Sequence, residues 1–477
     1  MSAHSYVFPL PSCYSPEISY RLADILPVHY PPEVISEILF QALPDDPQQP
    51  ISVHAAPILL TRVCRKWRAI ALSSPRLWNE FSISDTRAWS DESVESFCKV
   101  VDARLPLSGA LPISCYLVSQ DPRSFSRLLD ILCRHAHRWK SVMLEGVMGH
   151  VFPSLSVISF HFLENLDLNS DWGTESCTYA LLACIRSAAP RLRSMVIYWQ
   201  PSFIELALPW PELTHLVVQS AVFYCQYPVF DMAQILANAG KCRNLTLLAV
   251  HIWSCSEWIY PTFRVTLPRL RELRLAVPNS LILDSTLRAL ILPELQHLQL
   301  CAGLSTQAPL LHTLLADFLS PCTSSVISMN LVHVHMSEEE LMRILKNLPN
   351  LTSLSLIRTG FTAALFASLI LRFSDSGNLV FGQNTRLEKL EIGRDVFDMF
   401  DLRLLGIPDD IDKSLADVIE SRWRLPPNAM DGDEKPVSRL SSIYLHPSHW
   451  TEMQTASPGV CARISACCSE GLTLSFS

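Results

Sequence analysis

The sequence is poor in glycine and in charged residues, and it contains none of the short motifs that mark the common enzyme classes. Glycine accounts for 14 of 477 residues, and charged residues for 18%. Strings of the form GxxxxGK, GxGxxG, GxSxG or HExxH are missing, so a phosphate-binding loop, a nucleophile elbow or a zincin site has no local support. The formal net charge of -8 gives no electrostatic reason to expect a nucleic-acid partner. We therefore predict a protein that is not an enzyme and needs no cofactor.

Long apolar runs and paired cysteine motifs are also missing. No stretch approaches the roughly 20 uninterrupted apolar residues of a membrane-spanning helix, and the first residues lack the basic start of a secretory signal. The fifteen cysteines stand singly, apart from Cys467-Cys468, which indicates reduced and mostly buried thiols. We expect a protein of the cytoplasm, the nucleus or both, with no membrane partner.

Two histidine pairs could in principle bind a metal, but neither pair has the geometry and the further ligands that a metal site needs. His135 and His137 stand two residues apart at a predicted helix end, where positions i and i+2 do not share a face. His333 and His335 would share one strand face, without cysteine or carboxylate residues at a suitable spacing. We predict no metal site.

What the chain does contain is apolar sequence, at 49% of its residues. A chain of this length is too long for one ordinary core, which favours an elongated repeat architecture. We predict a flexible leader over residues 1–25, a compact helical region over 26–83, a connector and cap over 84–138, and a repeat region over 139–477.

Three short helices are predicted in the region 26–83. The first covers residues 31–42, where prolines suit the first turn and apolar residues recur at helical spacing on one face: Val34, Ile35, Ile38 and Leu39. The second has its apolar face at Leu60, Val63, Cys64, Trp67 and Ile70. Its other face carries Arg62, Arg65, Lys66 and Arg68, which we interpret as a solvated surface and not as a nucleic-acid patch. The third, predicted to be capped by Ser73 or Ser74, supplies Leu77, Trp78 and Phe81.

From residue 139 onward an LxxLxL-like string recurs, which is typical of a leucine-rich solenoid in which each string supplies one strand. Helical apolar patterns over residues 125–136, 311–318, 341–348 and 415–419 fill the connections, and prolines precede several strings. The eleven strings begin at Trp139, Leu163, Leu192, Leu213, Leu245, Leu270, Leu295, Val326, Leu351, Leu387 and Leu440.

The N-terminal region resembles the F-box. The usual pattern of that family runs from Leu-Pro-Pro-Glu through a paired aliphatic run to Val-Cys-Arg-x-Trp and a final Pro-x-Leu-Trp, and this chain reads PPEVISEIL and then VCRKWRAIALSSPRLW. Tyr30 stands where leucine is usual, and Leu26-Pro27 lies just upstream. The order of F-box and leucine-rich region, and the SRW string at residues 421–423, also resemble a broad family that is abundant in fungi.

The resemblance implies an α/β fold in which a three-helix F-box precedes an irregular leucine-rich-repeat solenoid with a curved parallel sheet and outer helices. It also implies a substrate-recognition adaptor of a Skp-cullin-F-box ubiquitin ligase, which binds a Skp-family adaptor and, through it, cullin. The matching positions for adaptor binding are Pro31, Pro32, Val34, Ile35, Ile38, Leu39, Leu60, Val63, Cys64, Trp67, Leu77 and Trp78.

The repeats would bind a protein target whose identity the sequence does not encode. Residues between the leucines of each string alternate onto the exposed sheet face, which is the natural binding surface. The candidate target-binding residues are Asn165, Asp167, Asn169, Tyr198, His215, Gln219, His251, Glu272, Arg274, His297, Gln299 and Asn330, with Lys389, Glu391, Tyr444 and His446 further along.

Three alternatives remain open. The N-terminal helices could simply cap the solenoid, a role that terminal repeats require. The chain could be a leucine-rich interaction scaffold that works without cullin. A hydrolase in an irregular α/β domain would require a deep pocket with convergent polar groups.

Overall fold

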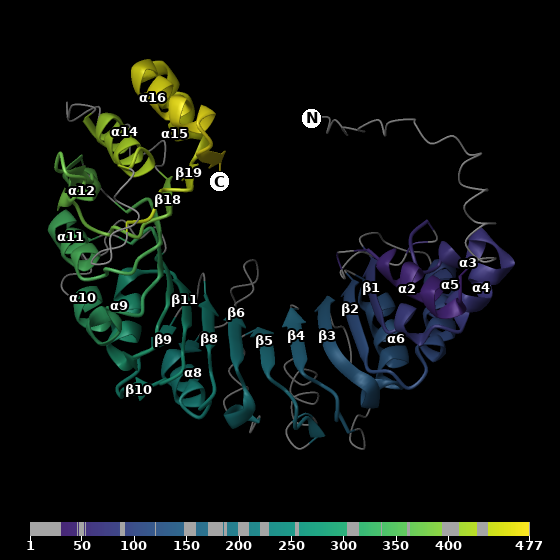
Figure 1. The fold of residues 1–477 in the computed structure, drawn as a ribbon. Coiled ribbons are helices and arrows are strands. Elements are labelled where there is room, and N and C mark those ends of the chain that lie inside the picture. Colours follow the sequence, from purple (N-terminus) through teal and green to yellow (C-terminus); the bar gives the residue numbers. More distant parts are fainter. Residues whose placement is uncertain are drawn as a thin grey trace, which may run out of the picture. The chain divides into compact units, whose positions relative to one another are not determined.

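The computed structural model describes residues 30–44, 46, 52, 54–85, 91–119, 121–146, 159–169, 185, 188–198, 209–219, 229–252, 257–302, 314–334, 336–359, 363–393, 410–426 and 437–476. The chain divides into two compact units, unit 1 over Met1–Arg191 and unit 2 over Leu192–Ser477. Each unit is an α/β structure built on a parallel sheet (Figure 1). The predicted leader lies outside the described residues.

Unit 1 begins with helices and continues as a sheet. Its strands pair in parallel in the order β1-β2-β3-β4, and α5 and α6 pack together, with α6 also against β2. Alternate residues of β2 are fully buried at Ile113, Cys115 and Leu117. The described elements are α2 (Pro32–Gln41), α3 (Leu60–Val63), α4 (Arg65–Leu72), η1 (Pro75–Leu77), β1 (Glu80–Asp85), α5 (Asp91–Arg104), η2 (Leu105–Ser108), β2 (Ile113–Ser119), α6 (Pro122–Cys133), η3 (Ala136–Arg138), β3 (Trp139–Gly146) and β4 (Asn165–Asn169).

Unit 2 is built on ten described strands that pair in parallel and almost in chain order. In that order they are β5 (Ser194–Tyr198), β6 (His215–Gln219), β8 (Leu247–His251), β11 (Glu272–Val277), β13 (His297–Ala302), β14 (Ser328–Val332), β15 (Ser353–Ile357), β18 (Lys389–Gly393), β19 (Ser442–Leu445) and β20 (Thr473–Phe476). Three small two-stranded sheets lie outside this array: β7 (Val229–Asp231) with β9 (Glu257–Ile259), β10 (Val265–Thr266) with β12 (Leu290–Ile291), and β16 (Arg372–Phe373) with β17 (Leu379–Phe381).

Helices connect the strands of unit 2 and lie along one face of the sheet (Figure 1). They are η5 (Trp210–Glu212), α8 (Met232–Ala239), α9 (Ser280–Ala289), α10 (Leu314–Leu319), η6 (Ser320–Cys322), α11 (Glu338–Lys346), α12 (Ala363–Leu369), α14 (Asp410–Trp423), α15 (Pro447–Ala456) and α16 (Pro458–Ser469). Within the described part of the chain, no helix combines the length and the apolarity that crossing a bilayer requires.

Short polar side chains start several of these helices by accepting a hydrogen bond from a backbone N–H in the first turn. Asp121 caps α6, Asp231 caps α8, Asn279 caps α9 and Ser337 caps α11. The helix positions are therefore encoded locally, between one strand and the next.

The core of unit 2 is made by the leucine positions of the strands. The parallel register places Leu248, Leu273 and Leu298 side by side, and each is at most 2% exposed. Leu275 and Leu300 form the next buried row. Because side chains alternate along a strand, the residues between these leucines point to the opposite side, which we call the helix-free face.

The SRW segment ends α14 and is held internally. Arg422 is fully buried and donates hydrogen bonds to the carbonyls of Leu369, Gln383 and Asn384, at 2.9, 2.6 and 2.8 Å. Burial lowers the pKa of Arg422 to about 9. This arginine joins α14 to the main chain of two other segments, at Leu369 and at Gln383–Asn384.

The predicted strands are confirmed, because each of the eleven strings contains one strand of a parallel sheet. The patterns over 125–136, 341–348 and 415–419 correspond to α6, α11 and α14, and α10 covers the described part of 311–318. Strands β1, β2 and β20 were not predicted, and β1 runs across the predicted boundary at residue 83.

Three local predictions for the N-terminal helices are wrong. The second helix is broken at Cys64 into α3 and α4. The third element is a single 3-10 turn, and the Ser74 hydroxyl does not cap it, because it donates instead to the carbonyl of Ile70 at 2.7 Å. Phe81 lies in β1, where it is buried.

Candidate functional site

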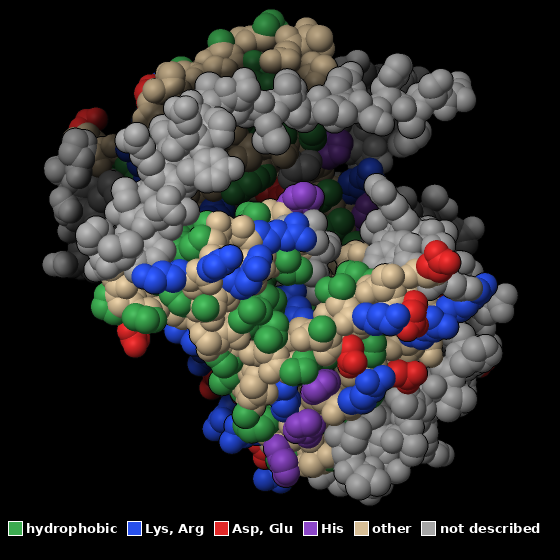
Figure 2. All heavy atoms as spheres, turned by 90° about the vertical axis from the view of Figure 1, so that its right-hand side faces the viewer, with side chains coloured by type: hydrophobic (Ala, Val, Ile, Leu, Met, Phe, Trp, Pro, Cys, Tyr) green, Lys and Arg blue, Asp and Glu red, His purple; other side chains and the backbone are tan. Residues whose placement is uncertain are grey.

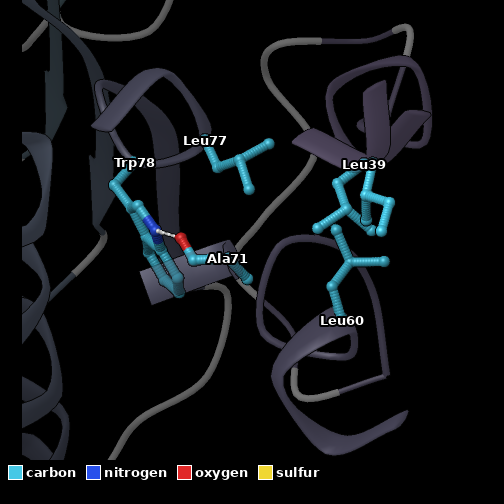
Figure 3. Close-up of a cluster of buried hydrophobic side chains, with 6 residues drawn as sticks. Leu39, Leu60, Ala71, Leu77 and Trp78 are labelled. Atoms are coloured by element: carbon cyan, nitrogen blue, oxygen red, sulfur yellow. Dashed lines mark hydrogen bonds between the residues drawn. The ribbon is translucent and has the colours of Figure 1, made fainter. Parts of the chain in front are cut away.

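The N-terminal helical module, which we define as α2, α3, α4, η1 and Trp78, has a small apolar core (Figure 3). Every helix contributes to it, and Trp78 closes it by donating from its indole Nε1 to the carbonyl of Ala71 at 2.7 Å. This bond satisfies the one polar atom of a buried indole. The core consists of Ile35, Leu39, Leu60, Ala71, Leu77 and Trp78.

The break at Cys64 determines how α3 and α4 present their side chains. Cys64 has extended backbone angles, with φ of -157° and ψ of 171°, so the chain changes direction there. Its Sγ accepts a hydrogen bond from the backbone N–H of Trp67 at 3.4 Å, which starts α4. Cys64 thus acts as an N-cap, a position where serine and threonine are usual.

Large apolar side chains remain on the outside of the same module. On α2, Val34 is 42% and Ile38 is 39% exposed, whereas Ile35 is 2% exposed and Leu39 is fully buried. We call the exposed set the apolar face of the module: Tyr30, Val34, Ile38, Leu59, Val63 and Leu72. Figure 2 shows hydrophobic side chains interleaved with Lys and Arg on the side of unit 1 that faces the viewer.

The twelve predicted adaptor-binding residues therefore fall into three groups by burial. Buried members that build the core are Ile35, Leu39, Leu60, Leu77 and Trp78. Exposed members that a partner could touch are Pro31, Pro32, Val34, Ile38 and Val63, while Cys64 and Trp67 are half-buried. Sequence reasoning missed Tyr30, Leu59 and Leu72, and the signal for Leu59 and Leu72 is their position at the ends of the broken helix pair.

The basic residues of α3 and α4 border this apolar face. Arg62, Arg65, Lys66 and Arg68 are all exposed, and the Nε of Arg68 donates to the carbonyl of Thr61 at 2.7 Å. On α2 the exposed carboxylate of Glu37 pairs with Arg76 at 3.2 Å. The apolar face thus has a predominantly cationic border on the α3–α4 side.

The predicted target-binding residues of unit 2 lie on the helix-free face. The register aligns His215, Glu272 and His297 in one row, and Arg274, Gln299 and Asn330 in the next. Glu272 and Arg274 pair at 2.5 Å. Gln219 and His251 are adjacent in a third row. Lys389, Glu391 and Tyr444 continue the first two rows on β18 and β19, and His446 follows β19.

Two of the predicted target-binding residues, one histidine and one aspartate, have shifted pKa values. Burial, and to a smaller degree the charge of Arg274, lowers the pKa of His251. In unit 1, burial raises the pKa of Asp167 to about 6, with a contribution from Glu145 on the neighbouring strand. Asn165 is exposed on β4 beside it. For Asn169 and Tyr198 the structure describes the backbone alone.

The described cysteines are free and mostly buried, as predicted. Burial raises the pKa of Cys133 and Cys242 to about 12 and that of Cys322 to about 11, which leaves them as protonated, unreactive thiols at neutral pH.

The histidine pairs are only partly described. His135 is half-buried and His137 exposed, next to α6, whereas His335 lies outside the described residues. No group of three His, Cys, Asp or Glu side chains in the described ranges could hold a metal ion.

Comparison of the sequence with protein-family models gave no match, and comparison with curated proteins gave none either. The resemblance to the F-box therefore rests on the residues quoted above.

Proposed function

We propose that this protein is a substrate-recognition adaptor of a Skp-cullin-F-box ubiquitin ligase. In this proposal the N-terminal helical module is the F-box and binds a Skp-family adaptor. The strand array of unit 2 is an irregular leucine-rich-repeat region that holds a protein target. The chain itself performs no covalent chemistry.

The observation that carries the proposal is the division of α2 into two sides. A helix that only capped the sheet would bury its apolar side chains inward, yet Val34 and Ile38 stay exposed while Ile35 and Leu39 fill the core. Leu59, Val63 and Leu72 add to the same kind of surface from α3 and α4. Several large exposed apolar side chains on one small module, with charged residues among them, are typical of a protein-binding site.

The mechanism would be proximity. The adaptor-bound module and the target-bound sheet face raise the local concentration of a target lysine near a ubiquitin-conjugating enzyme that another subunit recruits. Orientation then determines which lysine reacts.

The test is co-purification of the full chain with a Skp-family adaptor and cullin, compared with the variant Val34→Asp/Ile38→Asp. Both side chains are already exposed, so the fold should persist while two carboxylates enter an apolar interface. Adaptor affinity should fall roughly a hundredfold or more, since each factor of ten corresponds to about 1.4 kcal/mol. Trp67→Ala is a poorer test, because Trp67 packs against the core.

The matched control is Val380→Asp/Leu281→Asp, which adds the same two charges at exposed apolar positions of unit 2. It should bind the adaptor normally. Equal loss in both variants, or retention in both, would refute the proposed interface. Adaptor binding without cullin would instead support the cullin-independent scaffold.

A further inference from the structure

The middle of the helix-free face of unit 2 contains no formally charged side chain. Strands β13, β14 and β15 lie side by side there, and Glu272 and Arg274 on one flank and Lys389 and Glu391 on the other are the nearest charged residues in the adjacent strands. We call this central region the uncharged strip. It consists of His297, Gln299, Cys301, Ser328, Asn330, Val332, Ser353, Ser355 and Ile357.

Two neighbouring polar groups at the centre of the strip have no hydrogen-bond partner. Asn330 and Ser355 are paired in register on β14 and β15, and neither the Oδ1 of Asn330 nor the Oγ of Ser355 is accessible to solvent or bonded. Ser355 is 5% exposed. The hydroxyl of Thr359, two residues past the end of β15, is also buried without a hydrogen-bond partner. Buried polar atoms in folded proteins are nearly always satisfied, so the adjacent pair on β14 and β15 calls for a ligand that supplies the missing partners.

The backbone at the carboxyl end of the strip is strained. His333 follows β14 and Arg358 follows β15, and both have a φ of 55°, in the left-handed region that non-glycine residues seldom occupy. Their side chains are linked, with the Nη1 of Arg358 3.2 Å from the Nε2 of His333. Such conformations persist where the surroundings hold them, and they concentrate at binding sites.

We propose that the uncharged strip binds an extended peptide segment of the target through the peptide main chain. This inference rests on the proposed function of the sheet face. Carboxamide and hydroxyl groups of Gln299, Asn330 and Ser355 can each donate and accept, which matches the alternating N–H and C=O groups of a peptide. They do not match a phosphate or a strongly charged tract. No Phe, Tyr or Trp ring lies in the strip to stack on a sugar, which favours a peptide over a carbohydrate.

The experiment selects binders for the full chain from a phage-displayed library of random 12-residue peptides and measures the synthetic peptides by fluorescence polarisation. The variant Asn330→Leu/Ser355→Val should lower their affinity at least tenfold. Replacing single backbone N–H groups of a peptide with N-methyl groups should abolish binding at two or more positions. The melting temperature of the variant should stay the same or rise, because it removes unsatisfied polar atoms from the protein.

Ser475→Val is the matched control, since it makes the same kind of change as Ser355→Val in the same register row, but on β20 and outside the strip, and it should leave binding unchanged. Val34→Asp/Ile38→Asp should also bind the peptides normally, which separates this proposal from adaptor binding. Failure to select any binder, equal binding by Asn330→Leu/Ser355→Val, or insensitivity to N-methylation would each overturn main-chain recognition. Selection of carbohydrate ligands by a glycan array at the same residues would also overturn it.

Discussion

The N-terminal helical module and the helix-free face of unit 2 both direct side chains away from a leucine-rich core, yet the first presents an apolar surface and the second a polar one. In the module, Val34 and Ile38 remain outside because a core of six residues has no room for them. In the sheet, the inward leucines of the strings are buried, and the alternate positions carry mostly polar residues.

The two surfaces would therefore recognise their partners through different physical interactions. An apolar surface gains affinity from the area it removes from water, with little directionality. A polar sheet face gains specificity, because each unpaired donor or acceptor penalises a wrong ligand. A constant partner suits the first kind of surface, and a selected target suits the second.

The largest effect is expected when a core side chain of the N-terminal helical module is removed. Leu39→Ala should destabilise α2 by about 2–5 kcal/mol, because Leu39 is fully buried and the small core cannot collapse around the cavity. Native-state hydrogen exchange of the α2 amides measures this directly. Unchanged protection would contradict the core described for this module.

A second prediction concerns Asp167, a polar residue of the sheet in unit 1. The pKa of Asp167 is raised to about 6 from 3.8, so between these pH values the folded chain holds a proton that the unfolded chain has lost. The stabilisation that protonated Asp167 provides is complete below about pH 4 and disappears as the pH rises through 6. The loss is at most about 3 kcal/mol, from about 2.2 pKa units at 1.36 kcal/mol each.

Asp167→Asn should flatten this dependence and raise the free energy of unfolding at pH 7.5. Urea titrations of both proteins at pH 4.5 and 7.5 measure the effect. A wild-type stability that rises across this window, with the same rise in the variant, would show that Asp167 is well solvated.

A third prediction concerns the charged border of the apolar face. Arg62→Glu/Lys66→Glu reverses two exposed charges without entering the core. It should change the association rate with the adaptor several-fold and alter its salt dependence, while the dissociation rate changes less. Stopped-flow association at 50 and 300 mM salt tests this. An effect confined to dissociation would mean that these residues lie inside the interface.

The smallest effect is expected for Val34→Ala. Its free energy of unfolding should differ from that of the wild type by less than about 0.5 kcal/mol, because Val34 is exposed in the free protein. Thermal unfolding measures it, and adaptor binding should still weaken. A loss of stability as large as that of Leu39→Ala would erase the distinction between the two sides of α2.

The repeating strands could be predicted because their signal is strong and regular. Each LxxLxL-like string combines two inward leucine positions with alternating polar residues, and every one contains a strand. Strand β2 has the same alternation of buried residues at Ile113, Cys115 and Leu117. It was not predicted, because its sequence does not match the LxxLxL-like string. Strands β1 and β20 stand first and last in the strand order, and their sequences, EFSISD and TLSF, contain no LxxLxL-like string.

The N-terminal predictions went wrong where tertiary contacts outweigh local pattern. Helical spacing runs smoothly through Cys64, yet the chain turns there, and the thiol becomes a cap for α4. Ser74 is well placed to cap a helix by sequence, but its hydroxyl bonds to Ile70 and lies 2.9 Å from that of Ser36 on α2. The uncharged strip could not be predicted from the sequence for another reason. Its unsatisfied polar atoms become neighbours only through the pairing of β14 with β15.

The unbroken parallel register of unit 2 also bears on how such a chain can evolve. From β11 to β18, each described strand of the array pairs in parallel with the strand on either side through the same type of hydrogen-bond ladder. Duplicating or deleting one strand-and-helix segment would therefore leave the remaining contacts intact. Gain or loss of a segment within β13–β15 would widen or narrow the uncharged strip, so ligand range could change by recombination without any substitution in the core.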